Sequence, residues 1–114
     1  MMTDLSALSA LELAELVRTH QVSAEEVLDA NLARVEKVDG CPGALDADLS
    51  PEDANRVHAF ITHTNDIARR QAREVDARIA NGEAAGLLAG VPFTVKDIFC
   101  VRGTPSTAAS RILE

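Results

Sequence analysis

The sequence lacks tryptophan and tyrosine, and its aromatic side chains are limited to Phe60, Phe93 and Phe99. Because proteins that bind single-stranded nucleic acid stack bases on aromatic rings, this scarcity argues against such a partner. Basic residues are in the minority, with 11 lysines and arginines against 18 aspartates and glutamates, so the formal net charge is −7. Such a charge repels phosphate and anionic lipid, and direct binding to nucleic acid or to a membrane surface is not expected.

Long apolar runs are also missing. No stretch approaches the length of about 20 apolar residues that a helix needs to cross a bilayer. The first residues also lack the basic segment followed by an apolar segment that is typical of a signal peptide. The two cysteines, Cys41 and Cys100, form no C-x-x-C pair, so reduced thiols are expected rather than a disulfide framework or a metal site. These absences predict a cytoplasmic chain, and its 46% hydrophobic content predicts that it is globular.

Two helix-start signals of the same kind open the chain. Ser9 is followed three residues later by Glu12, and Ser23 by Glu26, and both pairs have the spacing of a capping box. The first helix should therefore start at Ser9 and end near residues 19–21. The second should start at Ser23 and break at the Asp39-Gly40 pair.

The middle of the chain predicts a loop, a short helix and a longer third helix. Residues 40–49 have no helical period and read as a surface loop, whereas Ser50-Pro51 should open a short helix with proline in its first turn. Residues 58–62 should be extended. The third helix should stop at Asn81-Gly82. Asp66–Arg70 and Glu74–Arg78 should form ion pairs on its solvent-exposed face. Its inward positions are Ala68, Ala72, Val75 and Ile79.

After residue 85 the composition changes. Val91-Pro92-Phe93-Thr94-Val95 has the β-branched and aromatic character of a strand. A single strand is not stable alone, so its partners should lie after Glu114 or in another chain. The predicted fold class is α/β. Residues 1–85 are expected to be a helical portion, and residues 86–114 to contain the first strand of a mixed sheet, the lysine motif and the loop that follows, all as part of one domain.

Lys96 follows this strand directly, at a place where enzymes often hold reacting groups. If apolar neighbours shield its ammonium from water, the neutral amine can accept a proton. The alternative is a plain surface lysine beside Asp97, which spacing alone favours.

Other candidate motifs are weaker. Residues 90–96 lack the second glycine and the hydroxyl residue of a phosphate loop, so nucleotide binding has little support. Residues 103–110 could present N–H groups and hydroxyls to a ligand, but they also fit an ordinary turn before a helix capped by Ser110. His20, His58 and His63 have no metal-ligand spacing, and His20 suits the carboxyl end of a helix.

A series of arginines on the third helix could suggest an RNA-binding stripe. Acidic residues interleave with it, which makes a solvated helix face the better interpretation. The residues concerned are Arg69, Arg70, Arg73 and Arg78, with Asp66, Glu74 and Asp76.

Taken together, the segments LAGVPFTVKDIF (88–99) and RGTPSTAASRILE (102–114) resemble the amino-terminal part of the amidase signature family. Within that family, TAASRILE (107–114) and ARIANGE (77–83) are most similar to the A subunits of glutamyl-tRNA(Gln)/aspartyl-tRNA(Asn) amidotransferases. The opening helices fit as well, so the resemblance covers nearly the whole chain. The segment from Gly40 to Arg56 departs from it, being longer than the link expected there.

The resemblance implies that Lys96 is a general base that takes a proton, through a cis-serine, from a nucleophilic serine. Both serines belong to a Gly/Ser-rich signature that this sequence does not contain, and Ser106 and Ser110 do not match their positions. The chain therefore supplies no nucleophile and should be inactive by itself.

The resemblance also implies glutamine as substrate, with a small C subunit and a tRNA-binding B subunit as partners. ATP and Mg²⁺ would be used by the partner and not by this segment. Two alternatives stay open: a piece of another amidase acting on a small amide, and a non-enzymatic helical interaction module.

Overall fold

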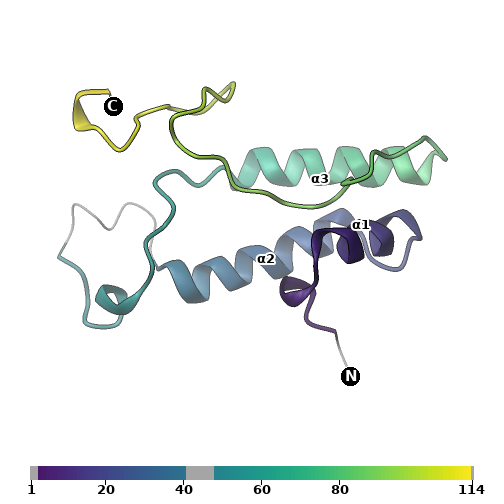
Figure 1. Cartoon of the computed structure of the whole chain (residues 1–114). Coiled ribbons are helices and arrows are strands. Elements are labelled where there is room, and N and C mark those ends of the chain that lie inside the picture. The colour runs from purple at the N-terminus through teal and green to yellow at the C-terminus, as the bar shows by residue number, and fades with distance from the viewer. Residues whose placement is uncertain (1–2, 41–47, 114) are drawn as a thin grey trace. The chain divides into compact units, whose positions relative to one another are not determined.

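The structure is a computed structural model that describes residues 3–40 and 48–113. Its helices are α1 (Ala10–Arg18), α2 (Ala24–Asp39) and α3 (Asn65–Ala80), with short 3-10 turns at Leu5–Ala7, Asp53–Asn55 and Arg111–Leu113 (Figure 1). The chain divides into two compact units. The first unit comprises Met1–Arg34 and Asn65–Pro92, and the second comprises Val35–Thr64 and Phe93–Glu114.

Both predicted capping boxes are confirmed. Glu12 accepts a hydrogen bond from the Ser9 backbone N–H at 2.9 Å, and the Glu12 N–H donates to the Ser9 hydroxyl at 3.4 Å. The Ser23 and Glu26 pair repeats this arrangement at 2.7 and 3.1 Å. Helices α1 and α2 therefore begin one residue after the two serines, because these bonds satisfy N–H groups that have no partner within the helix.

The apolar faces of the three helices form the core of the first unit. Burial of each large apolar side chain contributes about 1.5–3 kcal/mol. The predicted inward face of α3 is confirmed, since Ala72 and Ile79 are buried and Ala68 and Val75 pack against the same core. The core residues are Leu13, Val17, Ala24, Val27, Leu28, Ala72 and Ile79.

Helix α3 runs beside α2 in the opposite direction (Figure 1). An arginine pair on α3 meets an acidic pair on α2, with Arg69 to Asp29 at 2.5 Å and Arg73 to Glu25 at 2.7 Å. The arginine series is thus neutralised partly by the neighbouring helix. The sequence predicts this neutralisation only from acids on α3 itself.

The two ion pairs predicted within α3 were wrong. The structure instead pairs Arg70 with Glu74 at 3.9 Å and Arg78 with Glu83 at 3.4 Å, and all four side chains are more than half exposed. Exposed pairs of this kind contribute about 0–1 kcal/mol, so the choice among nearby partners costs little. The predicted end of α3 is confirmed, because the Gly82 N–H closes the last turn on the Ile79 carbonyl at 2.9 Å, with a φ of +74° at Gly82.

Asp76 of α3 caps the start of α2. Its carboxylate accepts hydrogen bonds from the Ala24 N–H at 2.7 Å and from the Glu25 N–H at 3.2 Å. Together with Ser23, it satisfies the first three N–H groups of α2. This contact spans about fifty residues, and no local sequence pattern predicts it.

We expect Asp76→Ala to lower the opening free energy of the first turns of α2 by about 1–2 kcal/mol, because two backbone donors lose their acceptor. Hydrogen exchange at the α2 amides measures this loss. Glu74→Ala, an exposed acid on the same helix with a long 3.9 Å ion pair, is the matched control and should change it by less than about 0.5 kcal/mol. Equal effects of the two variants would contradict the capping role.

In the second unit, Asp39 holds the connection that follows the loop. It is 5% exposed, and its carboxylate accepts from the Ala59 N–H at 2.5 Å and the Phe60 N–H at 3.4 Å. The predicted helix at Ser50 is reduced to a turn, with Asp53–Asn55 as its 3-10 part and the Asp53 N–H bonded to the Ser50 hydroxyl. The predicted loop lies largely in 41–47, outside the described residues.

The predicted strand at residues 91–95 is not formed. No residue within 3–40 and 48–113 is assigned to a strand, and 91–96 have no regular structure. A strand needs a neighbouring strand to pair its backbone groups, and the described part of the chain offers none. The described residues are therefore helical with irregular connections, and they do not form an α/β sheet.

Candidate functional site

Lys96 lies in the second unit, in the irregular segment that precedes a turn. Its carbonyl accepts a hydrogen bond from the Phe99 N–H at 3.0 Å, which closes that turn. The side chain is exposed, and no ion pair or hydrogen bond of its ammonium occurs among the described residues. The expected shielding of the amine is therefore not provided by this part of the chain.

Asp97, the next residue, is the centre of the best-connected polar cluster in this segment. Its carboxylate accepts from the Thr107 hydroxyl at 2.5 Å and from the Thr107 N–H at 3.1 and 3.2 Å. Its backbone carbonyl accepts from the Ala108 N–H at 3.1 Å and from the Ser106 hydroxyl at 3.2 Å. Residues 106–108 are thereby tied to the residue after Lys96.

These hydrogen bonds favour the ionised form of Asp97. The Thr107 hydroxyl is the largest cause that holds the pKa of Asp97 below its usual value, and backbone N–H groups of residues 107–109 act in the same direction, against the effect of burial. Because the pKa is lowered on folding, the bonds stabilise the loop at neutral pH. They are lost as the pH falls through the lowered value and the carboxyl takes up a proton.

In the hydroxyl-rich loop at 103–110, several N–H and hydroxyl groups donate hydrogen bonds to acceptors of the same chain. Besides the bonds to Asp97, the Thr104 N–H donates to the Val101 carbonyl at 3.1 Å and the Ser110 N–H to the Thr107 carbonyl at 2.8 Å. Ala108 and Ala109 have φ of 48° and 58°, a conformation that costs about 1 kcal/mol or more for each such residue. The ordinary-turn interpretation of this loop is therefore the better one.

The three histidines do not converge. His20 lies two residues after the last residue of α1, near the helix end where the sequence places it, and has a φ of 58°. The His58 ring contacts the Asp53 carbonyl at 2.6 Å, and the ring of His63 lies 5.7 Å from that of Phe60. Within residues 3–40 and 48–113, no group of three or more His, Cys, Asp or Glu side chains could hold a metal ion.

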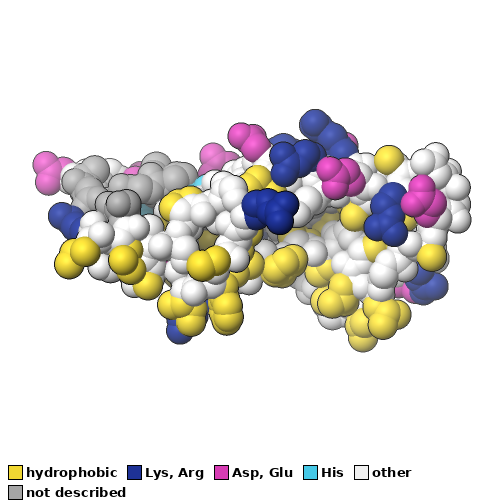
Figure 2. All heavy atoms as spheres, turned by 90° about the horizontal axis from the view of Figure 1, so that it is seen from above, with side chains coloured by type: hydrophobic (Ala, Val, Ile, Leu, Met, Phe, Trp, Pro, Cys, Tyr) yellow, Lys and Arg dark blue, Asp and Glu magenta, His cyan; other side chains and the backbone are white. Residues whose placement is uncertain are grey.

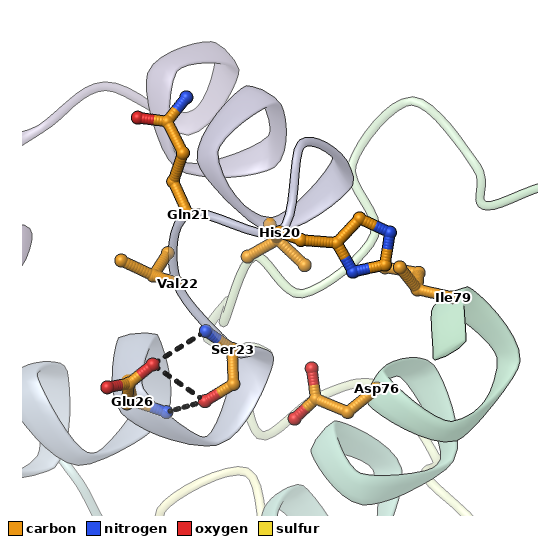
Figure 3. A pocket seen from close by; sticks show the side chains of 8 residues that line it. His20, Gln21, Val22, Ser23, Glu26, Asp76 and Ile79 are labelled. Atoms are coloured by element: carbon orange, nitrogen blue, oxygen red, sulfur yellow. Dashed lines mark hydrogen bonds between the residues drawn. The ribbon is translucent and has the colours of Figure 1, made fainter.

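A hollow of about 340 Å³ lies in the first unit, at the junction of α1, α2 and α3 (Figure 3). Three of its polar lining residues are already engaged, since Ser23 and Glu26 bond to one another and Asp76 caps α2. His20 and Ile79 lie on the same side of the hollow. The hollow is therefore a space between packed helix ends, and it offers few free polar groups to a ligand. Its lining residues are Val17, His20, Gln21, Val22, Ser23, Glu26, Asp76 and Ile79.

The segment around Lys96 exposes much apolar surface. Phe93 is 83% exposed and Phe99 is 61% exposed, and Val95, Ile98 and Val101 are also exposed. Hydrophobic side chains, drawn in yellow, are exposed at several places on the face shown in Figure 2. Large exposed apolar side chains gathered in one segment are typical of a surface that another part of a protein covers. Cys100, in the same segment, is a free exposed thiol, whereas Cys41 lies outside the described residues.

Sequence reasoning found Lys96 and the loop but missed the links that organise them. The sequence places Asp97 beside Lys96 but gives no specific sign that its carboxylate binds Thr107. The hydroxyl residues ten positions downstream gave a weak signal, because serine and threonine often donate to a nearby acidic side chain in turns.

Comparison with known proteins gives a consistent result. The sequence pattern of the Amidase family matches residues 51–114, which include Lys96 and the loop held by Asp97. The chain is 42% identical over 113 residues, 99% of its length, to the A subunit of the glutamyl-tRNA(Gln) amidotransferase of Cutibacterium acnes. It is 47% identical over 112 residues, 98% of its length, to the protein of the same name from Salinispora arenicola. It is 43% identical over 111 residues, 97% of its length, to the protein of the same name from Bdellovibrio bacteriovorus.

These alignments cover 20%, 20% and 19% of the three relatives, so the chain spans about a fifth of their length. No solved structure matches the chain significantly. Among the described residues, no helix has both the length and the apolar character needed to cross a membrane.

Proposed function

The chain belongs to the Amidase family, and from that premise we propose that it is the amino-terminal portion of a glutamine-hydrolysing A subunit of a tRNA-dependent amidotransferase. The whole enzyme would supply ammonia for converting Glu-tRNA(Gln) to Gln-tRNA(Gln) and Asp-tRNA(Asn) to Asn-tRNA(Asn). The observation that carries this proposal is the 42–47% identity over nearly the whole chain to relatives of that name.

In this enzyme Lys96 would be the general base. A nucleophilic serine would attack the amide carbonyl of glutamine while its proton passes through a cis-serine to the Lys96 amine, and the protonated amine would then return the proton to the leaving ammonia. Both serines would lie outside these 114 residues. Within residues 3–40 and 48–113 the Lys96 side chain is exposed and has no ion-pair partner. This supports the role, because the amine is then free to meet groups supplied by the rest of the enzyme.

The fold proposed for the complete protein is α/β. Residues 91–95 would pair there as the first strand of a mixed sheet, residues 1–85 would be its helical portion, and all 114 residues would be part of one amidase domain. Support comes from the exposed Phe93 and Val95, which lack a covering surface in the described chain. The same covering would shield the Lys96 amine from water.

The partners would be a small C subunit and a tRNA-binding B subunit in a cytoplasmic heterotrimer, with ATP and Mg²⁺ used by the tRNA-binding partner. The net charge of −7 fits this division of labour, since the tRNA would not be a ligand of this segment. A second candidate is an amidase that hydrolyses a small amide without tRNA, because the family match by itself names no substrate.

Ammonia release by the full-length chain tests these proposals. We expect hydrolysis of glutamine and co-purification with a tRNA-binding subunit. Turnover of a small amide such as propionamide, with no glutamine hydrolysis and no such subunit, would instead establish the second candidate. The 114-residue chain alone should release no ammonia, because it lacks the nucleophile, and robust hydrolysis by it would contradict both candidates.

A further inference from the structure

The backbone on the carboxyl side of the Lys96 Cα is engaged, although the side chain is free. The Lys96 carbonyl accepts from Phe99, and the following residue, Asp97, accepts from Thr107, Ala108 and Ser106. The lysine side chain is long and has several rotatable bonds. The position of its amine therefore depends on how firmly the backbone beneath it is held.

The Asp97 cluster is built to hold that backbone. Thr107 is 5% exposed, although it lies in an irregular loop, and it gives Asp97 both its hydroxyl and its N–H. A carboxylate at one end of a loop that accepts several hydrogen bonds from the other end fixes the distance between the two ends. Here the two ends are Asp97 and residues 106–108. The two alanines with positive φ follow directly, and such a conformation persists only where the surroundings hold it.

We propose that Asp97 is a positioning residue for Lys96. Its hydrogen bonds form a clamp that holds residues 106–108 against the backbone next to Lys96, and this places the Lys96 amine for proton transfer. This inference rests on the proposed function of Lys96. Asp97 does not act as an ion-pair partner of Lys96, because no such pair occurs among the described residues and its carboxylate is directed to Thr107.

The kinetic test compares the full-length enzyme with variants of the clamp. Asp97→Asn keeps the shape but removes the charge and one acceptor oxygen, and it should lower kcat for glutamine about 10- to 100-fold with KM changed less than about threefold. Thr107→Val removes the hydroxyl alone and should have a smaller effect in the same direction. Thr107→Ser keeps the hydroxyl and should stay within about twofold of the parent. The double variant Asp97→Asn/Thr107→Val should be no slower than Asp97→Asn, because both changes break one clamp.

A second readout follows the amine without requiring turnover. Lys37 and Lys96 are the two lysines of the 114 residues, and both are exposed, so Lys37 is an internal standard for competitive labelling with acetic anhydride. In Asp97→Asn the ratio of Lys96 to Lys37 labelling should rise about threefold or more as the amine leaves its fixed place, and in Thr107→Ser it should not change.

The two readouts separate this inference from the proposed function. An unchanged labelling ratio in Asp97→Asn overturns the positioning role. An unchanged kcat in Asp97→Asn, where Lys96→Ala has lost activity, overturns it as well. A raised ratio in Asp97→Asn, with full activity retained by a Lys96→Ala variant, supports the clamp and overturns the proposed role of Lys96 as the base.

Discussion

Replacing Lys96 by alanine in the full-length enzyme is expected to lower kcat for ammonia release from glutamine by about 10²- to 10⁴-fold, the usual contribution of a positioned general base. The amine is exposed and unpaired among the described residues, so its removal breaks no contact that the structure shows. Folding should therefore be unaffected, and thermal melting of the variant should match that of the parent.

Two matched variants show whether the base or the charge matters. Lys96→Arg keeps the positive charge, but a guanidinium does not release its proton in proteins, so this variant should be as slow as Lys96→Ala. Lys37→Ala removes the other exposed lysine of the chain and should leave kcat unchanged. Activity of Lys96→Arg near that of the parent would show that charge alone is needed and would refute proton transfer to this side chain.

Gly90→Ala is expected to cause the largest loss of stability, about 2–4 kcal/mol in the opening free energy of α1 and α2. Gly90 has a φ of +80°, which an alanine adopts only with strain. A Cβ at this position would also lie 2.9 Å from one Val17 methyl group, 3.0 Å from the other and 3.1 Å from the Ala24 Cβ. Val17 and Ala24 belong to the core, so neither can move away at low cost.

Two other glycines separate strain from overpacking. Gly82→Ala meets the same kind of backbone strain, at a φ of +74°, but no atom within 4 Å, and should cost only about 1 kcal/mol. Gly86→Ala meets neither obstacle and should change stability by less than about 1 kcal/mol. Hydrogen exchange at the α1 and α2 amides measures all three, and a Gly90→Ala loss no larger than that of Gly82→Ala would rule out the close packing on Val17.

The helix ends show which features can be read from a sequence. Ser9 with Glu12 and Ser23 with Glu26 were predicted because donor and acceptor lie three residues apart, and the helix itself brings them together. The ion pairs within α3 were predicted wrongly for a related reason. Several exposed acids lie within reach of each arginine, and the energy differences among such pairs are small.

The candidate site shows where sequence reasoning ends. Lys96 and its motif could be identified from residue types in order, and the family match includes them. The predicted shielding of Lys96 and the predicted strand at 91–95 are not found among the described residues. Both depend on a covering surface, and the described residues do not supply one.

The sequence by itself determined the three helices, the two capping boxes, the inward face of α3 and the family, because these depend on residues close together in the chain or on their order. The tertiary structure alone decided that Asp76 caps α2, that Arg69 and Arg73 pair with α2, and that Asp97 holds Thr107. Each of these contacts joins residues that the path of the backbone brings together, and a charge or hydroxyl takes whichever partner that path places within reach.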